Sequence, residues 1–131
     1  MRIATYLKFN GNCEKALNTY KELFNAELMC MHKFIESMTE NKELIGKIFH
    51  AELKIKEFFI YMADTDEELD FEKQVYKITI ECDTFEDAQK YYDTLLVGGT
   101  IIAPFTKMPW GDYMGHLRDS FGITWDIVFC G

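Results

Sequence analysis

The chain has 131 residues, of which 48% are hydrophobic and 15% aromatic, so its length and composition suit one compact folded domain. Its 14 Lys and Arg against 22 Asp and Glu give a net charge of −8, which argues against nucleic acid or an anionic membrane as partner. The longest apolar run, FFIYMA, is too short to span a bilayer, and the N-terminal segment lacks the apolar core of a signal peptide. Four scattered cysteines without a C-x-x-C motif predict reduced thiols in a cytoplasmic protein.

The first half of the chain predicts one strand, one helix and three further strands. The alternating segment IATYLKFN is followed by CEKALNTYKELF, residues 13–24, whose apolar residues recur at helical spacing. Asn12 is placed to cap that helix. Strand-like segments follow at about 28–36, 47–55 and 58–63.

The second half predicts the same order of elements. After an acidic connector at 65–73, the strand VYKITIEC precedes a helix at 85–96, with Thr84 as its cap. Gly98 and Gly99 end this helix, and strands follow at about 100–105, 112–118 and 123–129.

The two helices also share residues at matching positions. A shift of 72 residues aligns Glu14 with Glu86, Ala16 with Ala88, Tyr20 with Tyr92, and Leu23 with Leu95. Because the flanking strands match as well, the sequence predicts an α+β fold of two βαβββ modules, about 1–64 and 74–131, each with a helix packed on a mostly antiparallel sheet.

The segments FNGNCEKAL and DSFGITW, within a match from about 6 to 127, resemble the PhnB-like branch of the vicinal oxygen chelate superfamily. This superfamily contains glyoxalases, bleomycin-resistance proteins and extradiol dioxygenases. The resemblance implies two modules whose sheets curl around a shared cavity, usually in a homodimer. Its metal-dependent members hold a divalent ion with His and Glu from the first, fourth, fifth and eighth strands.

Carried onto this chain, the four metal positions fall at Thr5 (or Ala4 if the register shifts by one), Tyr61, Lys77 and Asp126. Threonine, tyrosine and lysine are poor ligands for Zn²⁺, Fe²⁺ or Mn²⁺, and an ammonium group repels the ion. We therefore expect no catalytic metal here. Lys77 and Asp126 are expected to form an ion pair instead.

The remaining candidates are aromatic or imidazole side chains. In IFHAELKI, the apolar set that begins at Phe49 should face the helix, which leaves His50 on the cavity face or in open solvent. Tyr6 and Tyr61 are cavity or core residues, and Trp110 follows a proline on a loop that lines a pocket mouth or a dimer interface.

Two histidines have weaker assignments. His116 is expected near Trp125 across a hairpin, where packing against the ring is a commoner role than ligand binding or catalysis. Cys30 and His32, two residues apart, could share a strand face and bind a metal, although two ligands make a poor site.

The leading functional hypothesis is a cytoplasmic homodimer that binds a small polar or aromatic molecule in its cavity without a catalytic metal. The alternative is a metal-dependent lyase, isomerase or dioxygenase in which His50, His116 and Asp126 surround an ion. A third hypothesis is a dimeric interaction module with no ligand. Because the chain has no glycine-rich strand–turn–helix motif for S-adenosylmethionine, methyl transfer is discounted.

Overall fold

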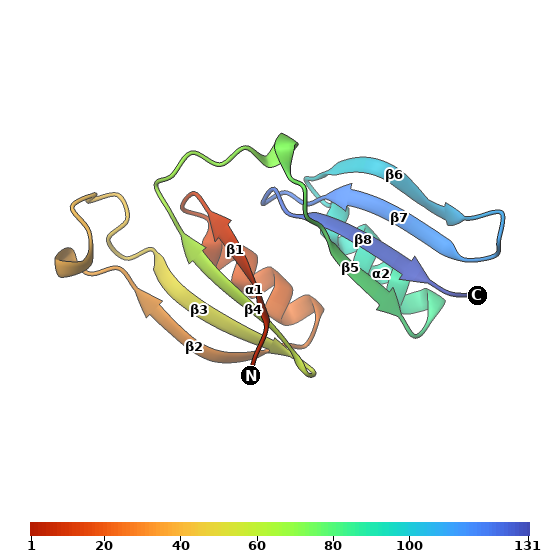
Figure 1. Cartoon of the computed structure of the whole chain (residues 1–131), viewed down its shortest axis with the longest axis horizontal. Coiled ribbons are helices and arrows are strands. Elements are labelled where there is room, and N and C mark those ends of the chain that lie inside the picture. The colour runs from red at the N-terminus through yellow and green to blue at the C-terminus, as the bar shows by residue number, and fades with distance from the viewer. The chain divides into compact units, whose positions relative to one another are not determined.

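The computed structural model describes residues 1–131 and divides the chain into two compact units, Met1–Leu69 and Asp70–Gly131. Each unit contains a four-stranded sheet with one α-helix packed on one of its faces (Figure 1). The boundary between the units falls within the acidic segment 65–73. No helix is long and apolar enough to cross a membrane.

Unit 1 has the strand order β1-β4-β3-β2, in which β1 runs parallel to β4 and the other neighbours are antiparallel. Its elements are β1 (Ala4–Phe9), α1 (Cys13–Leu23), β2 (Glu27–Lys33), the 3₁₀ helix η1 (Glu36–Met38), β3 (Ile48–Ile55) and β4 (Phe58–Asp64).

Unit 2 repeats this topology, with the order β5-β8-β7-β6 and one parallel pair, β5 with β8. The predicted α+β fold of two βαβββ modules is therefore confirmed. Its elements are the 3₁₀ helix η2 (Phe71–Lys73), β5 (Ile78–Cys82), α2 (Phe85–Leu96), β6 (Thr100–Lys107), β7 (Tyr113–Arg118) and β8 (Thr124–Phe129).

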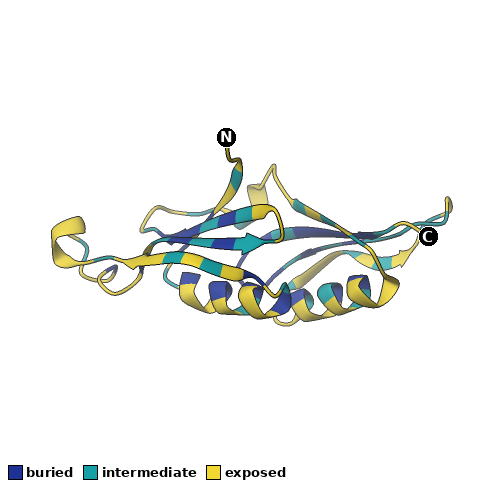
Figure 2. Ribbon diagram, turned by 90° about the horizontal axis from the view of Figure 1, so that it is seen from below, coloured by how far each residue is buried: buried dark blue, intermediate teal, exposed yellow.

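The repeated helix residues are core residues in both units. Ala16 and Ala88 are fully buried, and Tyr20 and Tyr92 are at most 4% exposed. Figure 2 shows the same division along each helix, with the buried side turned toward its sheet and the exposed side away from it. Three of the four identities that revealed the repeat are thus buried on the side of the helix that faces the sheet, whereas the Glu14–Glu86 pair is exposed.

One sheet contact differs from prediction. Phe49 is 39% exposed, whereas its neighbour Ile48 is fully buried. The pairing of β2 with β3 shifts between His32–His50 and Lys33–Ile48, so β3 carries an extra residue there. This irregularity reverses the alternation of buried and exposed side chains at the start of β3, and it brings Ile48, rather than Phe49, into the core.

Helix α1 also begins differently from prediction. Asn12 occupies the cap position but makes no side-chain capping hydrogen bond. The buried carboxylate of Asp64, at the end of β4, instead accepts hydrogen bonds from the amides of Gly11 at 2.8 Å and Cys13 at 3.0 Å. In unit 2 the predicted cap is present, because the Thr84 hydroxyl accepts a hydrogen bond from the amide of Asp87.

Candidate functional site

Each sheet has a face turned away from its helix, which we call the open face. In unit 1 the register places Tyr6 beside Tyr61 and Tyr61 beside Glu52, so these side chains share one face with His50. The residues of opposite parity, such as Leu7, Leu53 and Met62, are buried beneath them. Burial of that set fixes which side chains the open face presents.

Tyr6, His50 and Glu52 form a continuous hydrogen-bonded array on this open face. The Tyr6 hydroxyl lies 2.8 Å from His50 Nδ1, and His50 Nε2 lies 2.9 Å from Glu52 Oε2. Because an ionised carboxylate can only accept, Nε2 carries the hydrogen in this arrangement, and Nδ1 of the neutral ring accepts from Tyr6. The array can therefore hold or pass a proton along three side chains.

Tyr61 completes an aromatic cluster around the imidazole. Its ring centroid lies 5.2 Å from that of His50 and 6.0 Å from that of Tyr6, both in edge-to-face orientation. Arg2 donates to the Tyr61 hydroxyl at 3.3 Å and to Glu52 Oε1 at 3.4 Å. Tyr6 keeps 47% of its surface exposed, so the cluster remains accessible.

The electrostatics of the array favour an ionised Glu52. The hydrogen bond from His50 lowers the pKa of the Glu52 carboxyl, and Cys30 and Arg2 act in the same direction. Burial raises the pKa of the Tyr6 hydroxyl, and the charge of Glu52 adds to that rise. The ordinary state at neutral pH is thus a carboxylate at one end and a protonated phenol at the other.

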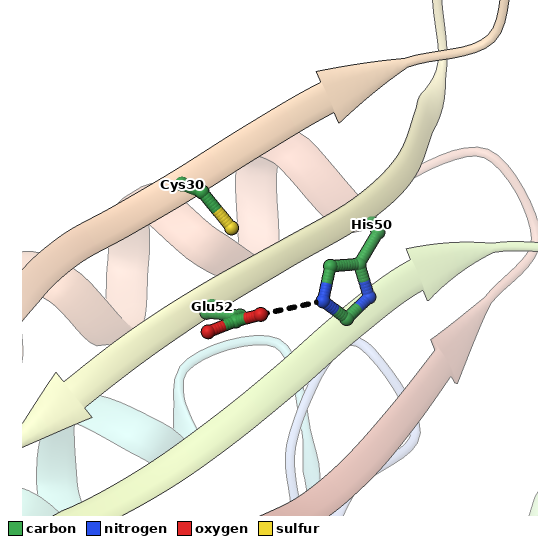
Figure 3. Close-up of side chains that lie close together, drawn as sticks. All are labelled: Cys30, His50 and Glu52. Carbon is green, nitrogen blue, oxygen red and sulfur yellow. Dashed lines mark hydrogen bonds and ion pairs between the residues drawn. The ribbon is translucent and has the colours of Figure 1, made fainter.

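Cys30 joins this array from the neighbouring strand, as Figure 3 shows, with its sulfur pointing toward the gap between Glu52 and His50. The register pairs Cys30 with Glu52 and His32 with His50. Cys30 thus lies with Glu52 and His50, whereas His32, which the sequence offered as a weak second ligand for Cys30, is exposed and is not part of this group.

Unit 2 has its own polar cluster, centred on Asp126, whose side chain is only 7% exposed. Lys77 Nζ lies 3.6 Å from Asp126 Oδ2, so the predicted ion pair is present. The Thr79 hydroxyl donates to the same oxygen at 3.2 Å. His116 Nδ1 lies 3.0 Å from Asp126 Oδ1, but it is not aligned as a hydrogen-bond donor, and this buried oxygen keeps an unused acceptor position.

The prediction for His116 was wrong in its partner. His116 pairs with Asp126 and Leu117 pairs with Trp125, so Trp125 lies on the face toward the helix. A difference of one residue in register exchanges the two faces of a strand. The indole of Trp125 instead donates to Asp119 at 2.8 Å.

Two other candidates lie away from these clusters. Trp110 is on the loop between β6 and β7 and is 66% exposed, which leaves its predicted role at a pocket mouth or an interface open. Thr5 pairs with the buried Ile60, so its side chain has the parity of the helix-facing set. Ala4 and Tyr6 are the β1 residues on the open face, and the first metal position therefore does not fall at Thr5.

Two buried aspartates that organise the backbone were not among the predicted residues. Asp64 also accepts from the amide of Ile48 at 3.1 Å, and Asp119 accepts from the amides of Phe121 and Ile123, each at 2.9 Å. Asp64 is the last residue of β4 and Asp119 directly follows β7, and this position at a strand end is their only signal in the sequence.

This arrangement of two βαβββ modules is a glyoxalase-like fold. A glyoxalase/bleomycin resistance protein/dioxygenase family enzyme from Burkholderia phytofirmans PsJN has the same fold, with a TM-score of 0.63 at 14% identity over 97% of this chain and 98% of that one.

The family follows from the sequence. The family model described as 3-demethylubiquinone-9 3-methyltransferase matches residues 1–128, and the chain belongs to this family. A PhnB protein from Bacillus cereus is similar in structure, with a TM-score of 0.86 at 24% identity over 98% of this chain and 99% of that one. Protein YjdN from Escherichia coli K12 is 25% identical over 97% of this chain and 94% of its own length. The resemblance to the PhnB-like branch is thus confirmed.

Proposed function

We propose that this protein binds a small organic molecule on the open face of unit 1, against Tyr6, His50 and Tyr61. The observation that supports this most is that Tyr6, which is half-exposed, places its hydroxyl 2.8 Å from His50 Nδ1, with His50 in turn held by Glu52. A surface array that only stabilised the sheet would not need an accessible phenol joined to an oriented imidazole. While its hydrogen is donated to His50, the Tyr6 oxygen can still accept a hydrogen bond from a ligand.

The chemistry of this face suits a small polar or aromatic molecule. Tyr6, Tyr61 and the imidazole pack against one another with ring centroids within 6.0 Å, and together they offer an aromatic surface that favours an aromatic partner. Arg2 uses only Nη1 for Glu52 and Tyr61, so the remaining N–H groups of its guanidinium can donate to a ligand with an oxygen acceptor. A purely aliphatic molecule would gain no hydrogen bond from this face.

Binding without a metal at the family positions is part of the proposal. Ala4, Tyr61 and Lys77 offer no good ligand, and the Lys77 ammonium already partners Asp126 at 3.6 Å. We propose that this ion pair stands where a metal-dependent relative holds its ion. Any Zn, Fe, Mn or Ni in the protein purified without chelator should therefore be unaffected by Asp126→Asn, as plasma mass spectrometry would show.

A metal-dependent lyase, isomerase or dioxygenase is the second candidate. Its support is that His116 and Asp126, two genuine ligand types, lie 3.0 Å apart and leave Oδ1 without an aligned donor. A tightly held ion that Asp126→Asn releases would favour this candidate. Methyl transfer is the activity in the family's description, and family membership is its only support. S-adenosylmethionine is therefore included in the ligand screen.

The test is a thermal-shift screen of the metal-free protein against small aromatic and polar acids, phenols and amides, followed by titration calorimetry of each hit. A ligand that binds the native state raises the melting temperature in proportion to its occupancy. Tyr6→Phe should weaken the Kd of a hit about three- to tenfold, the worth of one hydrogen bond. Tyr76→Phe, which changes an 84% exposed tyrosine outside the cluster, is the matched control. Equal weakening by both variants would contradict the site.

A further inference from the structure

Cys30, His50 and Glu52 form a cluster of three different metal-ligand types at positions the family does not use for its ion. One donor atom from each residue lies within 4.8 Å of the other two. The residues come from β2 and β3, whereas the family positions fall on β1, β4, β5 and β8. All three side chains are half-buried on the open face of unit 1.

We propose that this cluster is a Zn²⁺ site, with Cys30 Sγ, His50 Nε2 and Glu52 Oε2 as ligands. Zinc–ligand bonds are about 2.0 to 2.3 Å long, so three donors around one zinc ion lie within about 4 Å of one another. His50 Nε2 and Glu52 Oε2 are already 2.9 Å apart, and the Cys30 sulfur points into the space beside them (Figure 3). Small side-chain rotations bring the three atoms to bonding distance.

The donor set selects the type of metal. A thiolate, an imidazole and a carboxylate together suit a borderline ion such as Zn²⁺, and the sulfur disfavours Mg²⁺ and Ca²⁺, which prefer oxygen ligands. Three protein ligands leave one position of a tetrahedron open to water or a small molecule. Such a site fills when zinc is supplied.

The second observation in support is that outer partners for His50 and Glu52 are already in place. With zinc on Nε2, the neutral imidazole keeps its hydrogen on Nδ1, which donates to the Tyr6 oxygen 2.8 Å away. Arg2 holds the second oxygen of Glu52 at 3.4 Å. Such partners orient metal ligands and fix the tautomer of a ligating histidine. Only one proton is displaced, from the Cys30 thiol to solvent.

This site goes beyond the proposed function and does not depend on it. The zinc titration uses no organic ligand, and the screen for organic ligands uses metal-free protein. Failure of one experiment therefore leaves the other intact.

The test is a titration of the reduced, metal-free full chain with Zn²⁺, by competition against a chromophoric chelator, and with Co²⁺ by absorption spectroscopy. We expect one equivalent of zinc and a sulfur-to-cobalt charge-transfer band in the near ultraviolet. Cys30→Ser should abolish the band and the saturable binding, and Tyr6→Phe should weaken zinc binding about tenfold. Cys130→Ser, which removes an exposed thiol in unit 2, should change neither.

Circular dichroism and thermal melting establish that each variant is folded. Glu52→Gln is a second ligand substitution, which leaves the thiol in place. It should weaken zinc binding while retaining a cobalt–sulfur band at high Co²⁺. Equal zinc binding by the wild type and Cys30→Ser, or no binding by the folded wild type, would overturn the proposal.

Discussion

At the scale of single residues, Asp64 joins three segments of unit 1. Its carboxylate accepts from the amides of Gly11, Cys13 and Ile48, and its surface is 3% exposed. The start of α1, the start of β3 and the end of β4 therefore meet at one side chain. An orphaned amide in such a place has neither water nor a protein acceptor.

Asp64→Ala should lower the free energy of unfolding by roughly 3 kcal/mol or more, because buried amides lose a charged acceptor. Urea denaturation monitored by circular dichroism measures this change. Asp66→Ala, two residues along and exposed, should stay within about 0.5 kcal/mol of the wild type. A small effect of both substitutions would show that water replaces the Asp64 carboxylate.

Single residues also show which contacts of the candidate site could be predicted from the sequence and which could not. Strand alternation placed Tyr6, His50 and Tyr61 together, because their buried neighbours fix the parity of each strand. The partnership of Cys30 with Glu52 was not predictable, since it depends on the pairing of β2 with β3, whose register shifts twice. A similar dependence on register caused the wrong partner for His116. That the two open faces share one cavity stays a prediction.

At the scale of elements, the packing of α2 on its sheet depends on a glycine. A Cβ added at Gly115, on β7, would lie 2.7 Å from the Tyr92 ring and 2.8 Å from Cα of Phe105. Tyr92 is held in place as well, because its hydroxyl donates to the carbonyl of Ala103 at 3.1 Å. The ring therefore has little freedom to move aside.

Gly115→Ala should lower the free energy of unfolding by about 1 to 3 kcal/mol through overpacking. Thr106→Ala, an exposed substitution on the same hairpin, is the control. A further variant, Gly115→Ala with Tyr92→Phe, should recover part of the loss if the tyrosine hydroxyl is what fixes the ring. Equal stability of Gly115→Ala and the wild type in urea would contradict this packing.

At the scale of the whole molecule, both sheets end in strands with exposed apolar side chains. The outer strand β2 presents Met29 and Met31, and the outer strand β6 presents Ile101 and Ile102. An unpaired strand edge with an apolar surface is a site for association. We therefore expect these two edges to be the contacts of the homodimer that the family resemblance implies.

Light scattering at micromolar concentration should therefore give roughly twice the 15.4 kDa mass of the chain. Met31→Lys and Ile101→Lys should each shift the protein toward monomer, because a buried charge opposes association. Val75→Lys alters an 84% exposed residue outside both edges and should leave the mass unchanged. A monomeric wild type would refute the dimer.

The parallel pairing of β1 with β4 also has a consequence for how the chain folds while it is synthesised on the ribosome. Ala4 pairs with Phe59, and the whole of α1, β2 and β3 is translated between them. The nascent β1 therefore waits without its partner while the β2–β3 hairpin, which closes locally, is already able to form. During that interval, Leu7 and Phe9 are available to chaperones. Slow codons placed between β3 and β4 would prolong this exposure, whereas slow codons far enough beyond Asp64 that β4 has left the ribosome would give unit 1 time to close before unit 2 is complete.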